Sequence, residues 1–243
     1  MCHREGRIDR RTVLVGAGCL ALGWGLPGGA AAQNPRPRQS PIDIRRRRVT
    51  FVERLPKVSF RYPDTIDVTL VNTGSPGEFA TVRADVPLGA ARLFIKGTRW
   101  DLAQFHWHTP SEHEVEGRKT PLEMHLVHSR ADGALLVVAM FIERGRANRA
   151  LGPLFRALPD APGATRDVAD ARLRDLLPGR RRSFRYSGSL TTPPFTEPVR
   201  FIVFADSIEA SRRQIGLFQE VFPDGNAREV QRLNGRRVVS DAG

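Results

Sequence analysis

Short runs in which apolar and polar residues alternate follow one another along most of the chain. A period of two is typical of β-strands with one buried face, so each run predicts a strand. The runs lie at residues 58–62, 67–71, 81–83, 92–95, 102–108, 122–128, 135–142 and 199–204. Turn signals such as Asn72-Thr73-Gly74 and Asp132-Gly133 separate several of these runs. The pattern after residue 39 therefore predicts one β-rich domain.

Three other segments have the character of short helices. They lie near residues 148–158, 168–177 and 211–222, and Ser211 stands where an N-cap residue is expected. The sequence after residue 39 contains no internal repeat and no further linker. The expected fold class is mostly β (α+β), in a single domain at residues 39–240.

The first 32 residues have the pattern of an export signal. Arg10-Arg11 precedes an apolar, glycine-rich run, and Ala30-Ala31-Ala32 gives a small-residue cleavage pattern. The run is too short and too rich in glycine for a membrane span. The twin arginine favours the Tat route over the Sec route. We therefore expect a signal peptide at 1–32, a linker at 33–38, and an exported protein that is periplasmic or extracellular.

Composition excludes several classes of function. Both cysteines, Cys2 and Cys19, lie in the predicted leader, so the mature chain offers no cysteine nucleophile and no thiolate metal site. The chain has 38 Lys and Arg against 26 Asp and Glu, a formal net charge of +12. The arginines are dispersed in short groups without an aromatic-basic motif, so we expect no nucleic-acid binding. We interpret the charge as favouring solubility or adhesion to an anionic envelope.

Histidines on two of the expected strands carry the candidate chemistry. Alternation places Gln104, His106 and His108 on one face of the first strand, and Glu123 and His125 on one face of the second. Three imidazoles can then converge from adjacent strands, as in catalytic zinc sites that keep a fourth position for water. A polar side chain two residues before a histidine can reach its other ring nitrogen and fix the tautomer. The pattern therefore predicts a catalytic zinc centre.

Several sequence motifs accompany these histidines. They are Gln39-Ser40-Pro41-Ile42-Asp43-Ile44, Phe105-His106-Trp107-His108, Pro110-Ser111-Glu112-His113, Glu123-Met124-His125-Leu126-Val127-His128 and Ser189-Leu190-Thr191-Thr192-Pro193-Pro194, with a weaker match over 226–237. Together they resemble the signature of the α-class carbonic anhydrases of the exported, bacterial type. The resemblance covers residues 39–237 and implies a large twisted, mainly antiparallel central sheet with a few short peripheral helices.

The resemblance also implies a reaction, the reversible hydration of CO₂ to bicarbonate and a proton by zinc-bound hydroxide. The implied Zn²⁺ ligands are His106, His108 and His125. The residues that would hold the ligand rings are Gln104, Glu123 and, through its backbone carbonyl, Asn226. The implied partner is a small molecule, CO₂ or bicarbonate, while the sequence leaves the oligomeric state open.

Two further residues have catalytic roles by this resemblance. The Thr191 hydroxyl would accept the proton of the hydroxide and donate its own to Glu112, which aims the hydroxide at CO₂. An apolar wall would hold CO₂, and its residues would be Val127, Val137, Leu190 and Val199, with Thr192 beside them. His113, Tyr186 and His128 are interpreted as hydrogen-bonding residues of the core.

The chain departs from the family in the place where a histidine commonly relays the proton to buffer. Ser75 stands at that position, after the Asn72-Thr73-Gly74 turn. A serine hydroxyl does not titrate near neutral pH and cannot relay a proton. We therefore expect proton release to limit turnover. Phe201 stands where a tryptophan is usual, which predicts local repacking of apolar side chains.

Two other functions remain as alternatives. A non-catalytic carbonic-anhydrase-like binding or structural module would share the fold, although such relatives typically lose a zinc histidine. An unrelated zinc hydrolase would be expected to carry a His-Glu-x-x-His helix. This sequence has no such motif and places its candidate ligands on strands.

Overall fold

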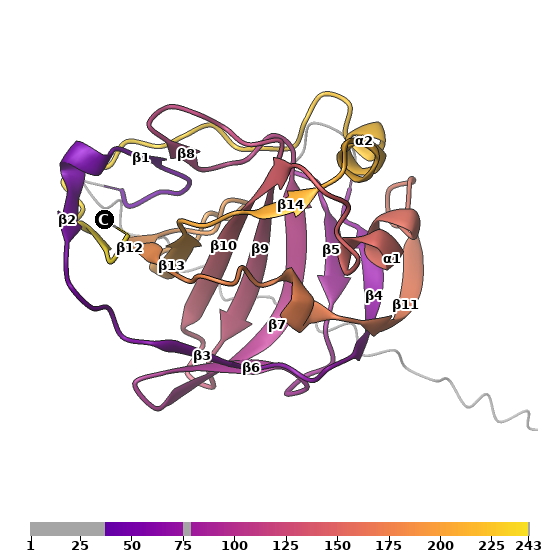
Figure 1. The fold of residues 1–243 in the computed structure, drawn as a ribbon, viewed down its shortest axis with the longest axis horizontal. Helices are drawn as coiled ribbons and strands as arrows, with labels where there is room; N and C mark the ends of the chain where they lie inside the picture. The colour runs from indigo at the N-terminus through magenta and orange to yellow at the C-terminus, as the bar shows by residue number, and fades with distance from the viewer. Residues whose placement is uncertain (1–36, 75–78, 243) are drawn as a thin grey trace, which may run out of the picture. The chain divides into compact units, whose positions relative to one another are not determined.

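A large, twisted β-sheet forms the centre of the protein (Figure 1). The computed structural model describes residues 37–74 and 79–242. The main path of the sheet runs β11-β4-β5-β7-β9-β10-β13-β12-β15-β2. The bounds of these strands are Thr165–Ala171 (β11), Ile66–Asn72 (β4), Val82–Asp85 (β5), Thr98–His108 (β7), Leu122–Ser129 (β9), Leu135–Arg144 (β10), Val199–Phe204 (β13), Ser183–Gly188 (β12), Val238–Ser240 (β15) and Val49–Phe51 (β2).

The remaining strands extend this sheet or form a small separate one. β14 (Ile208–Ala210) pairs with β10, and β3 (Val58–Arg61) is joined to β7 through β6 (Arg92–Ile95). β1 (Asp43–Ile44) pairs with β8 (Glu114–Val115) in a two-stranded sheet. Four pairs are parallel, namely β10–β13, β10–β14, β15–β2 and β1–β8, and the other pairs are antiparallel. The prediction of a mostly β fold with a large, mainly antiparallel central sheet is confirmed.

Helices are few and short, as expected. The bounds are Leu151–Arg156 (α1), Arg212–Val221 (α2), and two 3₁₀ helices, Arg46–Arg48 (η1) and Leu173–Leu176 (η2). Ser211 is the N-cap of α2, and a capping box joins it to Gln214, which satisfies backbone N–H groups at the helix start. α1 is shorter than the predicted 148–158. Within the described residues, no helix has the length and apolar character needed to cross a membrane.

The predicted helix at 168–177 is wrong over residues 168–171, and only the short 3₁₀ helix η2 lies in its second half. Residues 165–171 form the edge strand β11, which pairs antiparallel with β4, and η2 follows it. A register shift between Val168 and Ala171 marks a bulge, so these two buried residues are three positions apart instead of two. That spacing imitates the period of a helix in the sequence, which explains the incorrect prediction.

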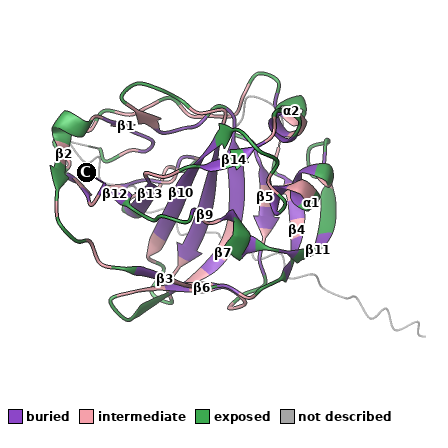
Figure 2. Cartoon of the chain, in the orientation of Figure 1, coloured by how far each residue is buried: buried purple, intermediate pink, exposed green. Residues whose placement is uncertain are grey.

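The sheet separates two apolar clusters. The larger one contains Phe105, Trp107 and Leu126 and is covered in part by α1 and α2, whose Phe155 and Phe218 rings pack against Trp107. The smaller one lies on the other face of the same strands and is given by Ile42, Ile44, Val127, Val137, Ala139, Phe141, Phe184, Tyr186, Val199, Phe201, Val203, Val238 and Ala242. Figure 2 shows that the central strands β7, β9 and β10 are buried along most of their length. The buried backbone of these strands supports the side chains on the face that carries the smaller cluster.

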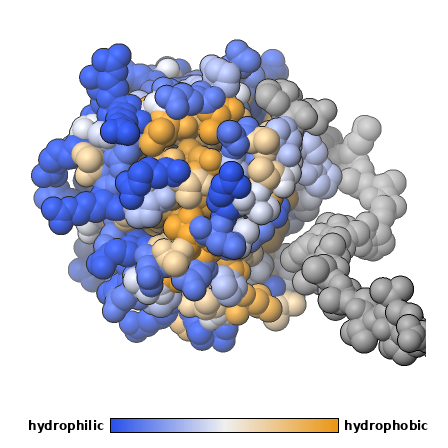
Figure 3. Space-filling model, turned by 90° about the vertical axis from the view of Figure 1, so that its right-hand side faces the viewer, coloured by the Kyte–Doolittle hydropathy of each residue, from blue (hydrophilic) through white to orange (hydrophobic). Residues whose placement is uncertain are grey.

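Polar side chains cover much of the surface. Figure 3, which shows the side of the molecule with α1 and β11, has hydrophilic residues around a band of hydrophobic ones. Many arginines pair with nearby acids, such as Arg182 with Asp206 at 3.1 Å and Arg172 with Asp175 at 2.6 Å. Exposed ion pairs of this kind contribute little to stability, because water and salt screen them.

Three of the predictions concern residues outside the described part of the chain. The signal peptide at 1–32 lies wholly outside it, and so do residues 33–36 of the predicted linker. Ser75, the predicted proton-relay position, also lies outside it.

Candidate metal centre

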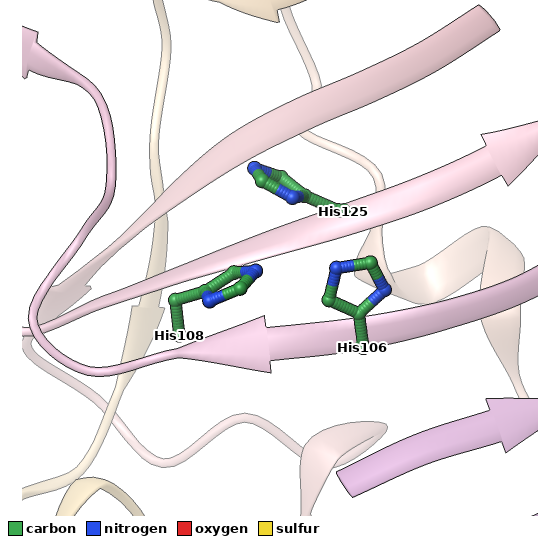
Figure 4. A group of neighbouring side chains, drawn as sticks. All are labelled: His106, His108 and His125. Carbon is green, nitrogen blue, oxygen red and sulfur yellow. The ribbon is translucent and has the colours of Figure 1, made fainter. Parts of the chain in front are cut away.

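The histidines of β7 and β9 lie together because the two strands are antiparallel neighbours. Their register puts His106 directly opposite His125 and His108 opposite Glu123. Residues opposite each other share a face of the sheet, so all three imidazoles rise from one face. Figure 4 shows the three rings turned toward one another. One ring nitrogen from each of His106, His108 and His125 lies within 4.8 Å of the others, and all three residues are buried.

The other nitrogen of each ring is held by a hydrogen bond. The ring N–H donates from His106 Nδ1 to Gln104 Oε1 at 2.8 Å and from His125 Nε2 to Glu123 Oε1 at 2.8 Å. The His108 Nδ1–H donates to the Asn226 backbone carbonyl at 3.3 Å. An amide oxygen, a carboxylate oxygen and a backbone carbonyl oxygen can only accept a hydrogen bond here. The ring nitrogen facing each of them must therefore carry the proton, which fixes the tautomer of each histidine. The free lone pairs are therefore on Nε2 of His106 and His108 and on Nδ1 of His125.

These free nitrogens fit a divalent metal ion. Among the residues that the structure describes, buried His108 Nε2 has no hydrogen-bond partner, which a protein interior rarely tolerates. A set of three neutral imidazoles suits zinc with an open fourth position. The hydrogen bonds to Gln104, Glu123 and Asn226 are of the type that orients metal-bound histidines.

The electrostatics of the site also favour neutral imidazoles at two positions. Burial, together with the neighbouring histidines, holds the pKa of His106 well below its usual value. Burial also lowers the pKa of His108, and this effect outweighs the opposing influence of Glu112. Burial alone would lower the pKa of His125, but the Glu123 carboxylate raises it overall. Metal binding requires the deprotonated ring nitrogen, so the first two positions are already in the binding form near neutral pH.

Asn226 is itself held firmly, although it lies far from the strands in sequence. Its side-chain oxygen accepts the Thr109 N–H at 2.7 Å, and its side-chain N–H₂ donates to the carbonyls of Ala80 and Trp107. The Asn226 N–H donates to the Thr109 carbonyl at 2.9 Å. These contacts fix the carbonyl that orients His108.

A buried chain of hydrogen bonds supports His125 from behind. Glu123 accepts the backbone N–H of His113 at 2.8 Å and its Nδ1–H at 2.6 Å. His113 Nε2 lies 2.6 Å from the Tyr186 hydroxyl, which in turn lies 2.9 Å from the Ser40 hydroxyl. The interpretation of His113 and Tyr186 as hydrogen-bonding core residues agrees with these contacts. His113, Glu123 and His125 also lie close enough to hold a metal, but direct hydrogen bonds already use their facing atoms.

Glu112 points into the metal centre. Its Oε1 accepts the Arg228 backbone N–H at 3.0 Å. Its Oε2 lies 3.4 Å from His108 Nε2 and 3.8 Å from His125 Nδ1, and this buried oxygen has no hydrogen-bond partner among the described residues. The expected hydrogen bond from Thr191 to Glu112 is thus not formed at that oxygen in this structure. Thr191 is buried in the segment that follows β12.

The predicted apolar wall belongs to the smaller cluster. Val127 and Val137 lie directly opposite each other on β9 and β10, on the same face as His125. Val199 is buried in this cluster, and Leu190 packs against it. Thr192 is half-buried, and its carbonyl accepts the Phe195 N–H at 2.9 Å in a tight turn. The structure therefore brings apolar side chains to the same sheet face as the imidazoles.

Sequence reasoning did not predict that two residues, Ser40 and Arg83, lie near the histidines. Ser40 ends the hydrogen-bond chain behind His125, and nothing in its local sequence indicates a contact with Tyr186. Arg83 lies opposite His106 on β5. Alternation in Val82-Arg83-Ala84-Asp85 could have placed Arg83 and Asp85 on one strand face, but not next to the histidines.

Three converging imidazoles with fixed tautomers, on one face of a large β-sheet, form a site that could hold a metal ion, as in enzymes with a three-histidine metal centre. The model of the eukaryotic-type carbonic anhydrase family matches residues 24–242 of the chain. The carbonic anhydrase of Klebsiella pneumoniae is 39% identical over 204 residues, which cover 83% of this chain and 79% of the relative. The chain therefore belongs to the α-class carbonic anhydrase family. The predicted resemblance and enzyme class are confirmed.

Solved structures agree with this assignment. The α-carbonic anhydrase from Thermovibrio ammonificans, in complex with the inhibitor sulfanilamide, has a TM-score of 0.76 and 38% identity. That match covers 83% of this chain and 86% of the other chain. Dioscorin complexed with ascorbate has a TM-score of 0.75 and 31% identity, and the match covers 84% of this chain and 85% of the other. The same fold is thus present in a protein whose name is not carbonic anhydrase.

Proposed function

We propose that this protein catalyses the reversible hydration of CO₂ to bicarbonate and a proton, with Zn²⁺ held by His106, His108 and His125. The observation that carries the proposal is the set of fixed tautomers, which leaves one free nitrogen per ring turned toward a common point. When bound, the zinc supplies a nucleophile near neutral pH by lowering the pKa of a water molecule, an effect for which carbonic anhydrase is the standard example.

Glu112 and Thr191 have an orienting role in this proposal. The unpartnered, buried Oε2 of Glu112 is a strong acceptor that needs a donor. The Thr191 hydroxyl is the donor we assign to it. A threonine that donates to Glu112 offers its own oxygen lone pair to the nucleophile, which fixes the direction from which CO₂ is attacked.

Substrate binding in this proposal relies on apolar contact. CO₂ is small and uncharged, so it needs a pocket without competing water more than it needs a charged clamp. Val127, Val137 and Val199 are buried on the face that carries the imidazoles, and Leu190 packs against them. This arrangement supports the binding of CO₂ next to the metal centre through apolar contacts alone.

Proton release and export complete the proposed function. Because Ser75 occupies the usual relay position, the proton is expected to leave through small buffer molecules and to limit turnover. The twin-arginine pattern and small-residue cleavage site support export to the periplasm or the extracellular space.

The test combines metal analysis with stopped-flow CO₂ hydration. We expect one zinc per chain and hydration activity in the purified protein, and loss of both in His106→Ala. His128→Gln is the control, since His128 is buried but bonds to Tyr62 and Leu126 instead of facing the triad. It should keep its zinc even if its stability falls.

Two results would contradict the proposal. A folded protein without zinc or activity would favour the non-catalytic module. Zinc binding without CO₂ hydration would favour a different zinc hydrolase.

A further inference from the structure

An arginine of β5 stands beside the metal centre. In the register between β5 and β7, Arg83 lies directly opposite His106 and Asp85 lies opposite Gln104. Residues opposite each other on antiparallel strands share a face, with Cβ atoms about 4.5–5.5 Å apart. Arg83 and Asp85 therefore extend the row of polar side chains that contains His106 and Gln104.

The Arg83 guanidinium is held by Asp85, but some of its N–H donors are not used in this pair. Its Nε donates to Asp85 Oδ1 at 2.6 Å and its Nη2 donates to Asp85 Oδ2 at 3.0 Å. A guanidinium group has five N–H donors, so this fork leaves others available. The side chains of Arg83 and Asp85 are 40% and 44% exposed, which means that a solute can reach them. The ion pair thus holds the guanidinium in place while part of its edge stays open.

The guanidinium and the triad share one face of the sheet. Arg83 is the cross-strand neighbour of His106 on β7, and His106 is the cross-strand neighbour of His125 on β9. An anion held at the triad would therefore lie on the same face as this positive charge, which attracts it.

We propose that Arg83, oriented by Asp85, forms a subsite beside the metal centre that binds small planar oxyanions, above all bicarbonate. A guanidinium fork matches the geometry of a planar oxyanion and forms strong, charge-assisted hydrogen bonds with it. Uncharged CO₂ gains nothing from this contact, so the subsite distinguishes the two sides of the reaction. The bicarbonate part of this inference rests on the function proposed above.

The direct test is the binding of nitrate, an unreactive planar oxyanion with the charge of bicarbonate. Calorimetric titration of the zinc-loaded protein should show that Arg83→Gln weakens nitrate binding by about 10-fold or more, the range for a hydrogen bond to a charged group. Arg99→Gln is the matched control. Arg99 forms the same type of pair with Asp101 and is 48% exposed. It lies seven residues before His106 on β7, roughly 23 Å away at 3.3 Å per residue.

Kinetics provide the second measurement. The assay uses saturating imidazole-type buffer, so that proton transfer does not limit turnover. Under these conditions the KM for bicarbonate should rise in Arg83→Gln, with kcat/KM for CO₂ hydration unchanged. Because the equilibrium constant ties the two directions together, kcat for dehydration should rise by the same factor as KM. Both quantities should stay at the original values in Arg99→Gln.

The outcomes separate this inference from the proposed function. If the unmodified protein hydrates CO₂ but Arg83→Gln binds nitrate as tightly as Arg99→Gln does, the subsite is wrong and the function stands. If the unmodified protein lacks zinc or activity, the proposed function fails, while the comparison of nitrate affinities, repeated on the protein as purified, still tests Arg83.

Discussion

Glu123 Oε1 accepts the Nε2–H of His125 at 2.8 Å, inside the protein and two residues away on the same strand face. The same carboxylate also accepts two N–H groups of His113. Burial alone would raise the pKa of Glu123, but the rings of His113 and His125 hold it well below its usual value. An ionised Glu123 keeps the His125 proton on Nε2 and leaves Nδ1 free for a metal.

Replacing Glu123 by glutamine should weaken zinc binding. The amide N–H₂ of glutamine cannot accept a hydrogen bond, so at least one of the donors from His113 and His125 loses its partner. Loss of such an orienting group typically lowers metal affinity by about 10- to 100-fold. Competition with a chelator would measure the change. Glu143→Gln, which alters an exposed carboxylate on β10, should leave the affinity unchanged. Equal affinities in the two variants would contradict this role.

The buried pair His128 and Tyr62 predicts a pH dependence of stability. The Tyr62 hydroxyl lies 2.7 Å from His128 Nε2, and His128 Nδ1–H donates to the Leu126 carbonyl at 3.0 Å. Burial lowers the pKa of His128 to about 3 from the usual 6.5. Between these pH values the unfolded chain binds more protons than the folded one. The contribution of neutral, buried His128 to the stability of the folded state is therefore fully present above pH 6.5 and is lost as the pH falls toward 3.

This single group changes the free energy of unfolding by up to about 1.4 kcal/mol per pH unit in that window. Urea unfolding at several pH values between 4 and 7 would measure the slope. His128→Gln removes the titrating ring, so its slope should be smaller than that of the unmodified protein. An identical slope would mean that other groups account for the acid sensitivity.

The serine at position 75 predicts that activity depends on buffer. With serine at the predicted relay position, we expect the rate of CO₂ hydration to rise as imidazole-type buffer is added, because the buffer carries the proton away. Stopped-flow measurements in dilute and concentrated buffer test this. Ser75→His should raise the rate in dilute buffer and reduce the effect of added imidazole. A rate that is already maximal in dilute buffer would show that proton release is not limiting.

The capping box of α2 predicts a measurable loss of stability. The Ser211 side chain accepts the Gln214 N–H, and the Gln214 side chain accepts the Ser211 N–H at 3.0 Å. Ser211→Ala should lower the free energy of unfolding by about 1 kcal/mol, since it leaves the Gln214 backbone N–H without its acceptor. Thermal or urea unfolding measures this. Ser207→Ala, at an exposed position before β14, should change stability little.

Local sequence was sufficient for strands whose side chains alternate strictly. The runs at 92–95 and 199–204 coincide with β6 and β13, and the run at 122–128 falls one residue short of β9. Prediction was poorer toward the two ends of the sheet. β2, β11, β12 and β15 were not predicted, and β11 was taken for a helix because its bulge spaces Val168 and Ala171 three residues apart. β2 and β11 are the end strands of the main path and bury few side chains, so their sequences carry a weak pattern. β12 is paired on both sides and mostly buried, and its short run was missed all the same.

The sequence by itself determined the chemistry of the site. It places three histidines on two apolar strands, and on each strand a polar residue lies two positions before the first histidine of the site. Alternation along a strand is a local property, so these pairings could be predicted from spacing alone. The tertiary structure decided what depends on strand register and on distant segments. It placed His106 opposite both His125 and Arg83, brought the Asn226 carbonyl to His108, and linked His113 to Glu123. Backbone carbonyls and cross-strand neighbours are set by how the chain packs, because no side-chain pattern in the sequence specifies them.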